Sequence, residues 1–294
     1  MEQKVLIILN PNAGLKQGKR YLADIISLFC KEKYEVSVSI TRQSGDARQI
    51  AMDKAAEFDR IVCIGGDGTF NEVAAGIMSS GCDATVGYIP AGSTNDFATS
   101  LNIPKSIMKA AEKVVSGTPR SIDIGDFNGR YFSYIASFGA FTKASYATPQ
   151  NVKNALGHIA YILEGLKELT SIQPYKVRFE TDVESFEDDY IFGAISNSTS
   201  VGGILTLDPD VVDMNDGLFE ILLVKSPKNI IELNECIAAI TSQNYDNKMI
   251  TFRNASRVEI FADPEMQWTL DGEHQSGCDK ISVRNIHNAL KIML

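Results

Sequence analysis

Strand and helix patterns alternate along residues 1–120. Short apolar or alternating runs predict strands at 4–9, 34–40, 60–64 and 85–89. Apolar residues spaced three and four apart predict helices at 17–32, 46–58, 71–79 and 105–115. This alternation is typical of a layered α/β domain with a mainly parallel sheet. We therefore predict the α/β fold class, with residues 1–120 forming the first domain.

The pattern changes after Pro119. Asn128-Gly129 predicts a tight hairpin, because both positions of such a turn need a positive φ angle. Strands are expected at 122–127, 131–137, 175–181, 187–196, 218–225, 257–262, 266–270 and 289–293, and helices at 151–170 and 228–240. Many short strands with few helices favour an antiparallel β-sandwich. We assign residues 121–294 to this second, substrate-binding domain.

Composition narrows the choice of protein class. The chain has 294 residues, 44% hydrophobic and 22% charged, which is enough for two globular domains. A net charge of -9 argues against nucleic acid as a partner. The five cysteines are odd in number and lack a CxxC spacing, as in a cytosolic protein with reduced thiols. With no signal peptide and no apolar run that could span a bilayer, we expect a cytoplasmic protein without a transmembrane segment. A homodimer remains open.

A glycine-rich turn follows the apolar run 60–64, with Gly65, Gly66 and Gly68 around Asp67 and with Thr69 next. Glycines let backbone N–H groups approach a phosphate closely, and a helix N-terminus adds partial positive charge. Asp67 would repel a phosphate unless a cation lay between them, which implies Mg²⁺. The alternative is a plain turn in which Asp67 caps the helix. The combination of residues after a buried strand favours a nucleotide site.

The next strand ends in a similar segment, Gly92-Ser93-Thr94-Asn95-Asp96. Ser93, Thr94 and Asn95 offer hydroxyl, amide and N–H donors to phosphate oxygens. Asp96 is a second carboxylate that could reach the metal or its waters. We also expect Ser93 or Thr94 to cap the helix that follows.

Residues 10–14 and 41–46 end the first two strands. Ligands of open α/β sheets bind at the carboxyl ends of the strands, so we expect these segments to meet the two glycine-rich turns. The run 14–20 looks like a P-loop, but it is one residue short and lacks Ser or Thr after the Lys.

Two acidic residues in the second half of the chain are candidates for a catalytic general base. Asp271 and Glu273 stand at alternate positions after the expected strand 266–270. A kinase that acts on an alcohol needs a carboxylate to orient the hydroxyl and accept its proton. Asp271 is our candidate base, and Glu273 could assist it or bind metal. The alternative for Asp271-Gly272 is a hairpin turn.

Two other segments leave two interpretations open. The turn 213–218 could hold a structural cation through Asp213, Asp216 and the Leu218 carbonyl, or it is a plain turn. The expected helix 151–170 has an apolar stripe with basic flanks, so it either packs in the core or lies on a membrane.

These motifs resemble the bacterial diacylglycerol kinase-like lipid kinase family, which includes sphingosine and ceramide kinases. The resemblance runs along nearly the whole chain, through residues 10–14, 65–72, 92–98, 202–218 and 271–273. NAD kinases and phosphofructokinases carry similar Gly-Gly-Asp-Gly turns, and residues 92–98 make the resemblance to lipid kinases specific. Where relatives tend to carry a further Gly and a basic residue, this chain has Gly202-Gly203-Ile204-Leu205-Thr206.

The resemblance implies two domains with ATP bound at the crevice between them. It implies that Asn10, Thr41, Gly66, Asp67, Gly68, Thr69 and Thr94 contact the nucleotide. To these we add, as candidates from the same motifs, Gly65, Glu72, Gly92, Ser93 and Asn95. The resemblance further implies that Asp67 and Asp96 organise Mg²⁺ and that Asp271 is the general base, with Glu273 beside it. A structural Mg²⁺ would lie at Asp213, Asp216 and Leu218.

We therefore expect an ATP-dependent kinase that phosphorylates a lipid hydroxyl, with diacylglycerol as the first substrate to consider. It would meet its lipid as a peripheral protein at the inner face of the membrane. The alternatives are a kinase of a soluble substrate, resembling NAD kinase, and a non-catalytic regulator that binds lipid or nucleotide. Retention of Asp67, Asp96 and Asp271 argues against the regulator.

Overall fold

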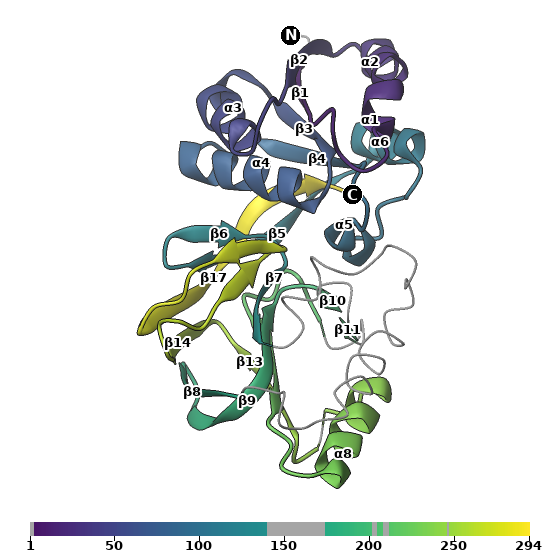
Figure 1. Cartoon of the computed structure of the whole chain (residues 1–294). Coiled ribbons are helices and arrows are strands. Elements are labelled where there is room, and N and C mark those ends of the chain that lie inside the picture. Colours follow the sequence, from purple (N-terminus) through teal and green to yellow (C-terminus); the bar gives the residue numbers. More distant parts are fainter. Residues whose placement is uncertain (1–2, 140–173, 202–204, 208–211, 246) are drawn as a thin grey trace. The chain divides into compact units, whose positions relative to one another are not determined.

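The computed structural model describes residues 3–139, 174–201, 205–207, 212–245 and 247–294 (Figure 1). The chain divides into two compact units, Met1–Ile124 with His287–Leu294, and Gly125–Ile286. The division falls within two long strands, β5 (Pro119–Phe127) and β17 (Lys280–Met293). Each unit has its own sheet pairing and is described by itself.

The first unit is an α/β layer structure, in which the strands β2, β1, β3 and β4 lie side by side in that order and run parallel. Helix α2 packs on α6, and α3 packs on α4 (Figure 1). The predicted parallel α/β fold is confirmed. Its elements, in chain order, are β1 (Lys4–Leu9), α1 (Gln17–Arg20), α2 (Leu22–Lys31), β2 (Glu35–Ile40), α3 (Asp46–Lys54), η1 (Ala55–Glu57), β3 (Arg60–Gly65), α4 (Asp67–Ser80), β4 (Thr85–Pro90), α5 (Asp96–Ser100) and α6 (Ile107–Ser116).

The last residues of the chain belong to this unit, whereas the sequence pattern placed 287–294 in the second domain. Lys291 and Ile292 near the end of β17 pair in parallel with Thr85 and Val86 of β4. Leu290, Ile292 and Met293 are buried. Pairing with an existing buried sheet removes these apolar side chains from water, which explains why this segment joins the first unit.

The second unit is built from antiparallel strands. β9 pairs with β8 through its first half and with both β7 and β12 through its second half. The predicted antiparallel β-rich fold is confirmed. Its elements, besides its parts of β5 and β17, are β6 (Arg130–Phe132), β7 (Ile135–Gly139), β8 (Tyr175–Thr181), β9 (Ser185–Ser196), β10 (Ser200–Val201), β11 (Leu205–Thr206), β12 (Phe219–Lys225), α8 (Ile230–Thr241), β13 (Ile250–Ala255), β14 (Arg257–Phe261), β15 (Trp268–Leu270) and β16 (Glu273–Gln275).

An aromatic core fills the second unit. The Trp268 ring lies 4.9 Å from the Phe138 ring and 5.2 Å from the Phe127 ring, measured between centroids. Phe132 stacks on Phe219 at 5.6 Å. Side chains of this size dominate core energetics because each removes a large apolar area from water. Trp268 therefore fixes the strand that leads into the candidate base, Asp271.

Some predicted features fall outside the described residues. These are the helix 151–170 and, within the motif range 202–218, residues 202–204 and 208–211. Among the described residues, no helix is long and apolar enough to cross a membrane. All five cysteines are free thiols.

Candidate functional site

The N-terminus of α4 forms the centre of the site in the first unit. β3 ends at Gly65, and α4 begins only two residues later, at Asp67. The first N–H groups of a helix have no partner within the helix, and they carry its positive dipole end. This is the usual binding geometry for a phosphate group. The glycine-rich turn is therefore a helix start, and the binding of a phosphate there stays a prediction.

The two glycine-rich segments approach each other backbone to backbone. A Cβ atom added at Gly92 would lie 2.6 Å from the Gly66 Cα atom. Gly14, at the end of β1, has a φ of +49°, and a Cβ there would lie 2.5 Å from the Ala91 carbonyl oxygen. The ends of β1, β3 and β4 thus converge at one edge of the sheet, as the sequence predicted from strand ends alone.

Asp67 links the two segments through hydrogen bonds. Its Oδ2 accepts from the Asp96 N–H at 2.9 Å, and its Oδ1 accepts from the Phe97 N–H at 3.3 Å and the Tyr88 hydroxyl at 3.2 Å. Burial raises the pKa of the Asp67 carboxyl, an effect that these donors partly oppose. A role for Asp67 toward Mg²⁺ stays a prediction. Its structural role is to connect the start of α4 to β4 and to the start of α5.

The cap of α5 corrects one expectation. Neither Ser93 nor Thr94 caps this helix, since its N-cap is Asn95, in the left-handed conformation and without a side-chain cap bond. The carboxylate of Asp67 satisfies the first N–H groups of α5 instead. A carboxylate is the better partner, because it also interacts favourably with the helix dipole.

The turn before α5 is closed by Asn95. Its side-chain oxygen accepts from the Gly92 N–H at 2.9 Å, and its side-chain N–H donates to the Gly92 carbonyl at 3.0 Å. The Asn95 amide therefore shapes the turn, whereas Ser93 and Thr94 at its tip are exposed. Asp96 is partly exposed at the start of α5, where its carboxylate would supply the hard oxygen donors that Mg²⁺ prefers.

The ends of β1 and β2 carry the other predicted nucleotide contacts. The Asn10 side-chain N–H donates to the Thr69 hydroxyl at 3.0 Å, which ties β1 to the first turn of α4. Thr41 is buried, and its N–H donates to the Leu9 carbonyl at 2.9 Å. Asn10, Thr41 and Thr69 thus share one edge of the sheet with Gly66.

Glu72 has a visible structural partner. Its carboxylate accepts from the Gly45 N–H at 2.8 Å, the Ala47 N–H at 3.1 Å and the Ser44 hydroxyl at 3.3 Å. It therefore caps α3 from the neighbouring helix α4. Glu72 holds the loop 41–46 in place, and its predicted contact with nucleotide stays a prediction.

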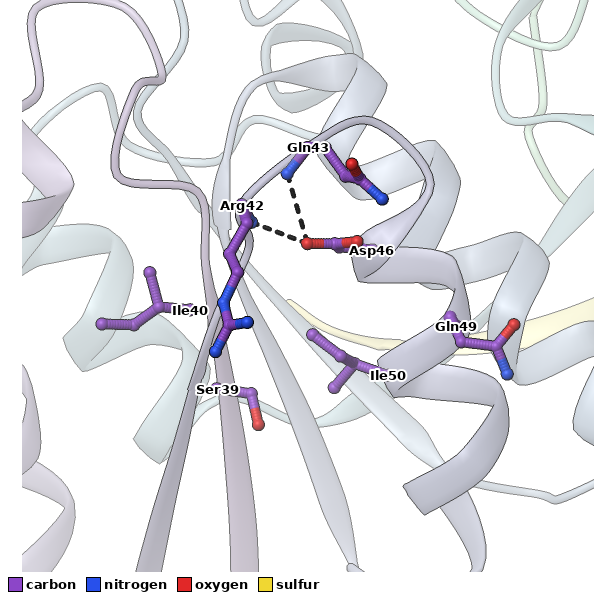
Figure 2. Close-up of a pocket in the computed structure, with 7 residues that line it drawn as sticks. All are labelled: Ser39, Ile40, Arg42, Gln43, Asp46, Gln49 and Ile50. Atoms are coloured by element: carbon purple, nitrogen blue, oxygen red, sulfur yellow. Dashed lines mark hydrogen bonds between the residues drawn. The ribbon is translucent and has the colours of Figure 1, made fainter.

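A pocket borders this loop (Figure 2). Its volume is about 590 Å³. Asp46 stabilises the rim, because its Oδ2 accepts from the Arg42 N–H at 2.7 Å and the Gln43 N–H at 3.2 Å. The sequence pattern pointed to residues 41–46 as a strand end but missed the pocket, which α3 helps to form. The lining residues are Ser39, Ile40, Arg42, Gln43, Asp46, Gln49 and Ile50.

In the second unit, Asp271 is anchored by the backbone. Its carboxylate accepts from the N–H groups of Ser133 at 2.6 Å and of Tyr134 and Ile135 at 3.0 Å each. Asp271 and Gly272 have φ angles of 50° and 83° and join β15 to β16, so the hairpin interpretation is also confirmed. The turn holds a buried carboxylate at a fixed place, which is what a general base requires.

Glu273 pairs with a basic residue. Its carboxylate lies 2.7 Å from the Arg130 guanidinium, which also donates to the His274 carbonyl at 2.9 Å and the Gln275 side chain at 3.0 Å. Both partners of the ion pair are partly exposed, so it contributes little to stability. The pair orients Glu273, whose catalytic role stays a prediction.

The turn 213–218 is an ordered acidic turn. Asp213 accepts from the Asn215 N–H at 3.0 Å, and Asp216 accepts from the Leu218 N–H at 2.8 Å. The Leu218 carbonyl accepts from the Asn285 side chain at 3.0 Å. Among the described residues, no three His, Cys, Asp or Glu side chains converge closely enough to hold a metal directly. The donor set of carboxylate and carbonyl oxygens nevertheless suits Mg²⁺ with part of its water shell retained.

Comparisons with known proteins agree along the whole chain. Residues 4–127 match the diacylglycerol kinase catalytic domain, and residues 135–294 match the YegS C-terminal NAD kinase beta sandwich-like domain. A diacylglycerol kinase of Bacillus subtilis (strain 168) is 37% identical over 274 residues, 92% of this chain and 90% of that protein. A diacylglycerol kinase of Staphylococcus saprophyticus is 31% identical, over 93% of this chain and 90% of that protein.

Solved structures share the fold. One chain from Bacillus anthracis strain Sterne superposes with a TM-score of 0.82 at 24% identity, covering 99% of this chain and 95% of that one. A diacylglycerol kinase from the same strain superposes with a TM-score of 0.75 at 21% identity, covering 99% and 96%. The chain belongs to the diacylglycerol kinase family of ATP-dependent lipid kinases.

Proposed function

We propose that this enzyme transfers the γ-phosphoryl group of ATP to the free hydroxyl of diacylglycerol, giving phosphatidate and ADP. The observation that carries the proposal is the start of α4, where glycines let the backbone approach a phosphate beside a second glycine-rich turn. The curated relatives that share 31–37% of their residues with the chain are named diacylglycerol kinases. The hydroxyl oxygen attacks the γ-phosphorus, the bond to the β-phosphate oxygen breaks, and the hydroxyl proton leaves with a base.

Each set of residues has a proposed task. The first N–H groups of α4, together with Ser93 and Thr94, bind the phosphates and stabilise the charge that develops on them. Mg²⁺, when bound, offsets phosphate charge, and Asp96 and Asp67 are its proposed protein partners. Asp271 accepts the hydroxyl proton, and Glu273 keeps the surrounding turn oriented through Arg130.

The acceptor lipid defines where the enzyme works. Diacylglycerol resides in the membrane, so the proposed enzyme acts as a peripheral protein at the inner face of the cytoplasmic membrane. A homodimer is compatible with this function, and nucleic acid is not among the proposed partners.

A lipid-panel assay tests the proposed substrate. Purified enzyme, MgCl₂ and γ-labelled ATP are mixed with detergent micelles that contain dioleoylglycerol, ceramide or sphingosine, and a parallel reaction contains NAD. We expect label in phosphatidate at a rate at least tenfold above that for the other acceptors. Label mainly in NADP would identify a soluble-substrate kinase, and no transfer to any acceptor would favour a non-catalytic regulator.

We further propose that the pocket beside Thr41 accommodates the adenine base. Thr41 lies between the lining residues Ile40 and Arg42 in sequence, and Figure 2 shows the Arg42 side chain between Ile40 and Ile50. A planar guanidinium and apolar walls suit an aromatic base. Side-chain amides of Gln43 and Gln49 offer both donors and acceptors to the edges of the ring.

Substitution of Arg42 tests the adenine pocket. Arg42→Ala should raise the KM for ATP roughly 3- to 30-fold, the range expected when a cation–π contact is lost, with kcat nearly unchanged. The matched control is Arg48→Ala, since Arg48 is exposed on α3 and does not line the pocket. Equal KM values for the wild type and Arg42→Ala, or an equal rise in both variants, would reject this location for the base.

A further inference from the structure

Glu220 is a buried acid that the phosphoryl-transfer mechanism does not use. It is the second residue of β12, and its side chain is fully buried. The neighbours Phe219 and Ile221 belong to the aromatic core, so strand alternation turns Glu220 to the opposite face of the sheet. On that face its partner across β9 is Ser196, whose hydroxyl already bonds to the carbonyls of Tyr134 and Ser198.

Neither carboxylate oxygen of Glu220 has a hydrogen-bond partner outside its own residue among the described residues. Leaving an acid of this kind in a protein interior costs several kcal/mol by order of magnitude. The charged groups that act on it make this worse, because Asp216 and Asp213 are also acidic. Within the described ranges, no protein side chain compensates this group.

A second acceptor without a partner lies next to the same turn. The Asn285 side-chain N–H donates to the Leu218 carbonyl, while its Oδ1 is buried and has no partner among the described residues. The residues around the turn therefore present oxygen acceptors from Glu220, Asn285, Asp213 and Asp216, three of which are carboxylates. Oxygen acceptors in excess of donors are the ligand set of a hydrated divalent cation.

We propose that Glu220 and Asn285 are the buried outer shell of a divalent-cation site at the turn 213–218. Asp213, Asp216 and the Leu218 carbonyl would contact the ion, and its bound waters would donate to Glu220 and to the Asn285 Oδ1. Water-mediated contact agrees with the finding that, within the described ranges, three acidic side chains do not converge directly. Mg²⁺ fits best, because it keeps several waters and needs few protein ligands. The resemblance to lipid kinases implied that Asp213, Asp216 and Leu218 bind the ion. Glu220 and Asn285 are new to the site, and they are assigned to it because their buried oxygens lack hydrogen-bond donors among the described residues.

Magnesium binding without nucleotide or lipid tests this site independently of catalysis. The intact protein is titrated with MgCl₂ after EDTA treatment, and both heat of binding and melting temperature are recorded. Wild type should bind Mg²⁺ and gain melting temperature in a saturable way. Glu220→Gln should weaken Mg²⁺ binding about 10- to 100-fold, the usual effect of removing an outer-shell partner. In EDTA the same variant should melt no lower than wild type, because it lacks the uncompensated acid.

Two variants serve as controls. Glu259→Gln changes a partly buried glutamate of the same unit that already pairs with Arg257 and Lys280, and it should bind Mg²⁺ like wild type. Asp216→Asn should weaken binding at least as much as Glu220→Gln. If Asp216→Asn weakens binding and Glu220→Gln does not, the assignment of Glu220 is wrong. The proposed site is also rejected if the wild type binds no Mg²⁺ at about 20 mM, roughly twentyfold above the dissociation constant of about 1 mM found for weak protein sites of hard cations.

A folding failure of Glu220→Gln would not leave the question open. Asn285→Ala then gives the same readout, since it removes the other buried acceptor while the backbone bond from the Asn285 N–H to Ser256 is retained. Weaker Mg²⁺ binding by Asn285→Ala supports the proposed outer shell, and unchanged binding overturns it.

Discussion

Asp271→Asn should lower kcat for lipid phosphorylation by about 10²- to 10⁴-fold, the usual contribution of a general base, while the KM for ATP changes little. The amide cannot accept the hydroxyl proton. It also presents an N–H group where the carboxylate now accepts from backbone N–H groups, including that of Ser133. The measurement is steady-state kinetics with dioleoylglycerol micelles, combined with calorimetric ATP binding.

The loss of backbone bonds should also lower the melting temperature, so a control must separate stability from chemistry. Leu270→Val supplies it, because Leu270 is fully buried in β15 next to Asp271 but carries no acceptor. This variant should melt several degrees lower and keep most of its turnover. If Asp271→Asn retains wild-type turnover, Asp271 is not the base. If Leu270→Val loses as much kcat as Asp271→Asn, the effect arises from the turn itself.

The anchoring of Asp271 explains why one predicted strand is divided in two. The alternating pattern favoured a continuous strand over 131–137, but the structure has β6 and β7 with a break at Ser133 and Tyr134. The N–H groups of these two residues bind the Asp271 carboxylate, which is 138 and 137 residues away in sequence. No local pattern can reveal a partner at that distance, so this part of the site required the structure.

Parts of the fold that depend on apolar runs were predictable from the sequence. The strands β1, β3 and β4 are buried nearly throughout, and such runs have few other stable environments. The prediction missed strands with many polar residues, among them β13, β16 and the 280–288 part of β17. All three are partly exposed and carry charged residues at positions open to solvent, which makes them resemble loops.

In the candidate site too, features set by neighbouring residues could be predicted, whereas contacts between residues far apart in the sequence could not. Glycines after a buried strand located the start of α4, although the expected helix began at residue 71 rather than 67, because glycine normally weakens a helix pattern. The sequence could not predict that the carboxylates of Asp67 and Glu72 hold neighbouring segments in place through hydrogen bonds. Most of their partners are backbone N–H groups 25 to 30 residues away, and backbone groups leave no trace in side-chain composition.

Gly92→Ala is the second change for which we expect a large effect. A Cβ atom at this position would lie 2.6 Å from the Gly66 Cα and 2.7 Å from the Asn95 Oδ1. Either the two glycine-rich turns move apart or the Asn95 bond that closes the second turn breaks. Displacement of the phosphate-binding groups by about 1 Å can cost roughly 10²-fold in rate, so kcat/KM for ATP should fall by at least that factor. Calorimetry should show a matching loss of affinity for the ATP analogue AMP-PNP.

A control substitution at a glycine with open space around it distinguishes this clash from a general loss of stability. Gly81 follows α4 with a φ of +68°, and a Cβ there would meet no atom within 4 Å. Gly81→Ala should therefore cost about 1–2 kcal/mol of stability through backbone strain alone, with unchanged kcat/KM and nucleotide affinity. If Gly92→Ala binds AMP-PNP as wild type does, the phosphates do not depend on the contact between the two turns. If Gly81→Ala loses binding equally, stability rather than the approach of Gly92 to Gly66 determines nucleotide affinity.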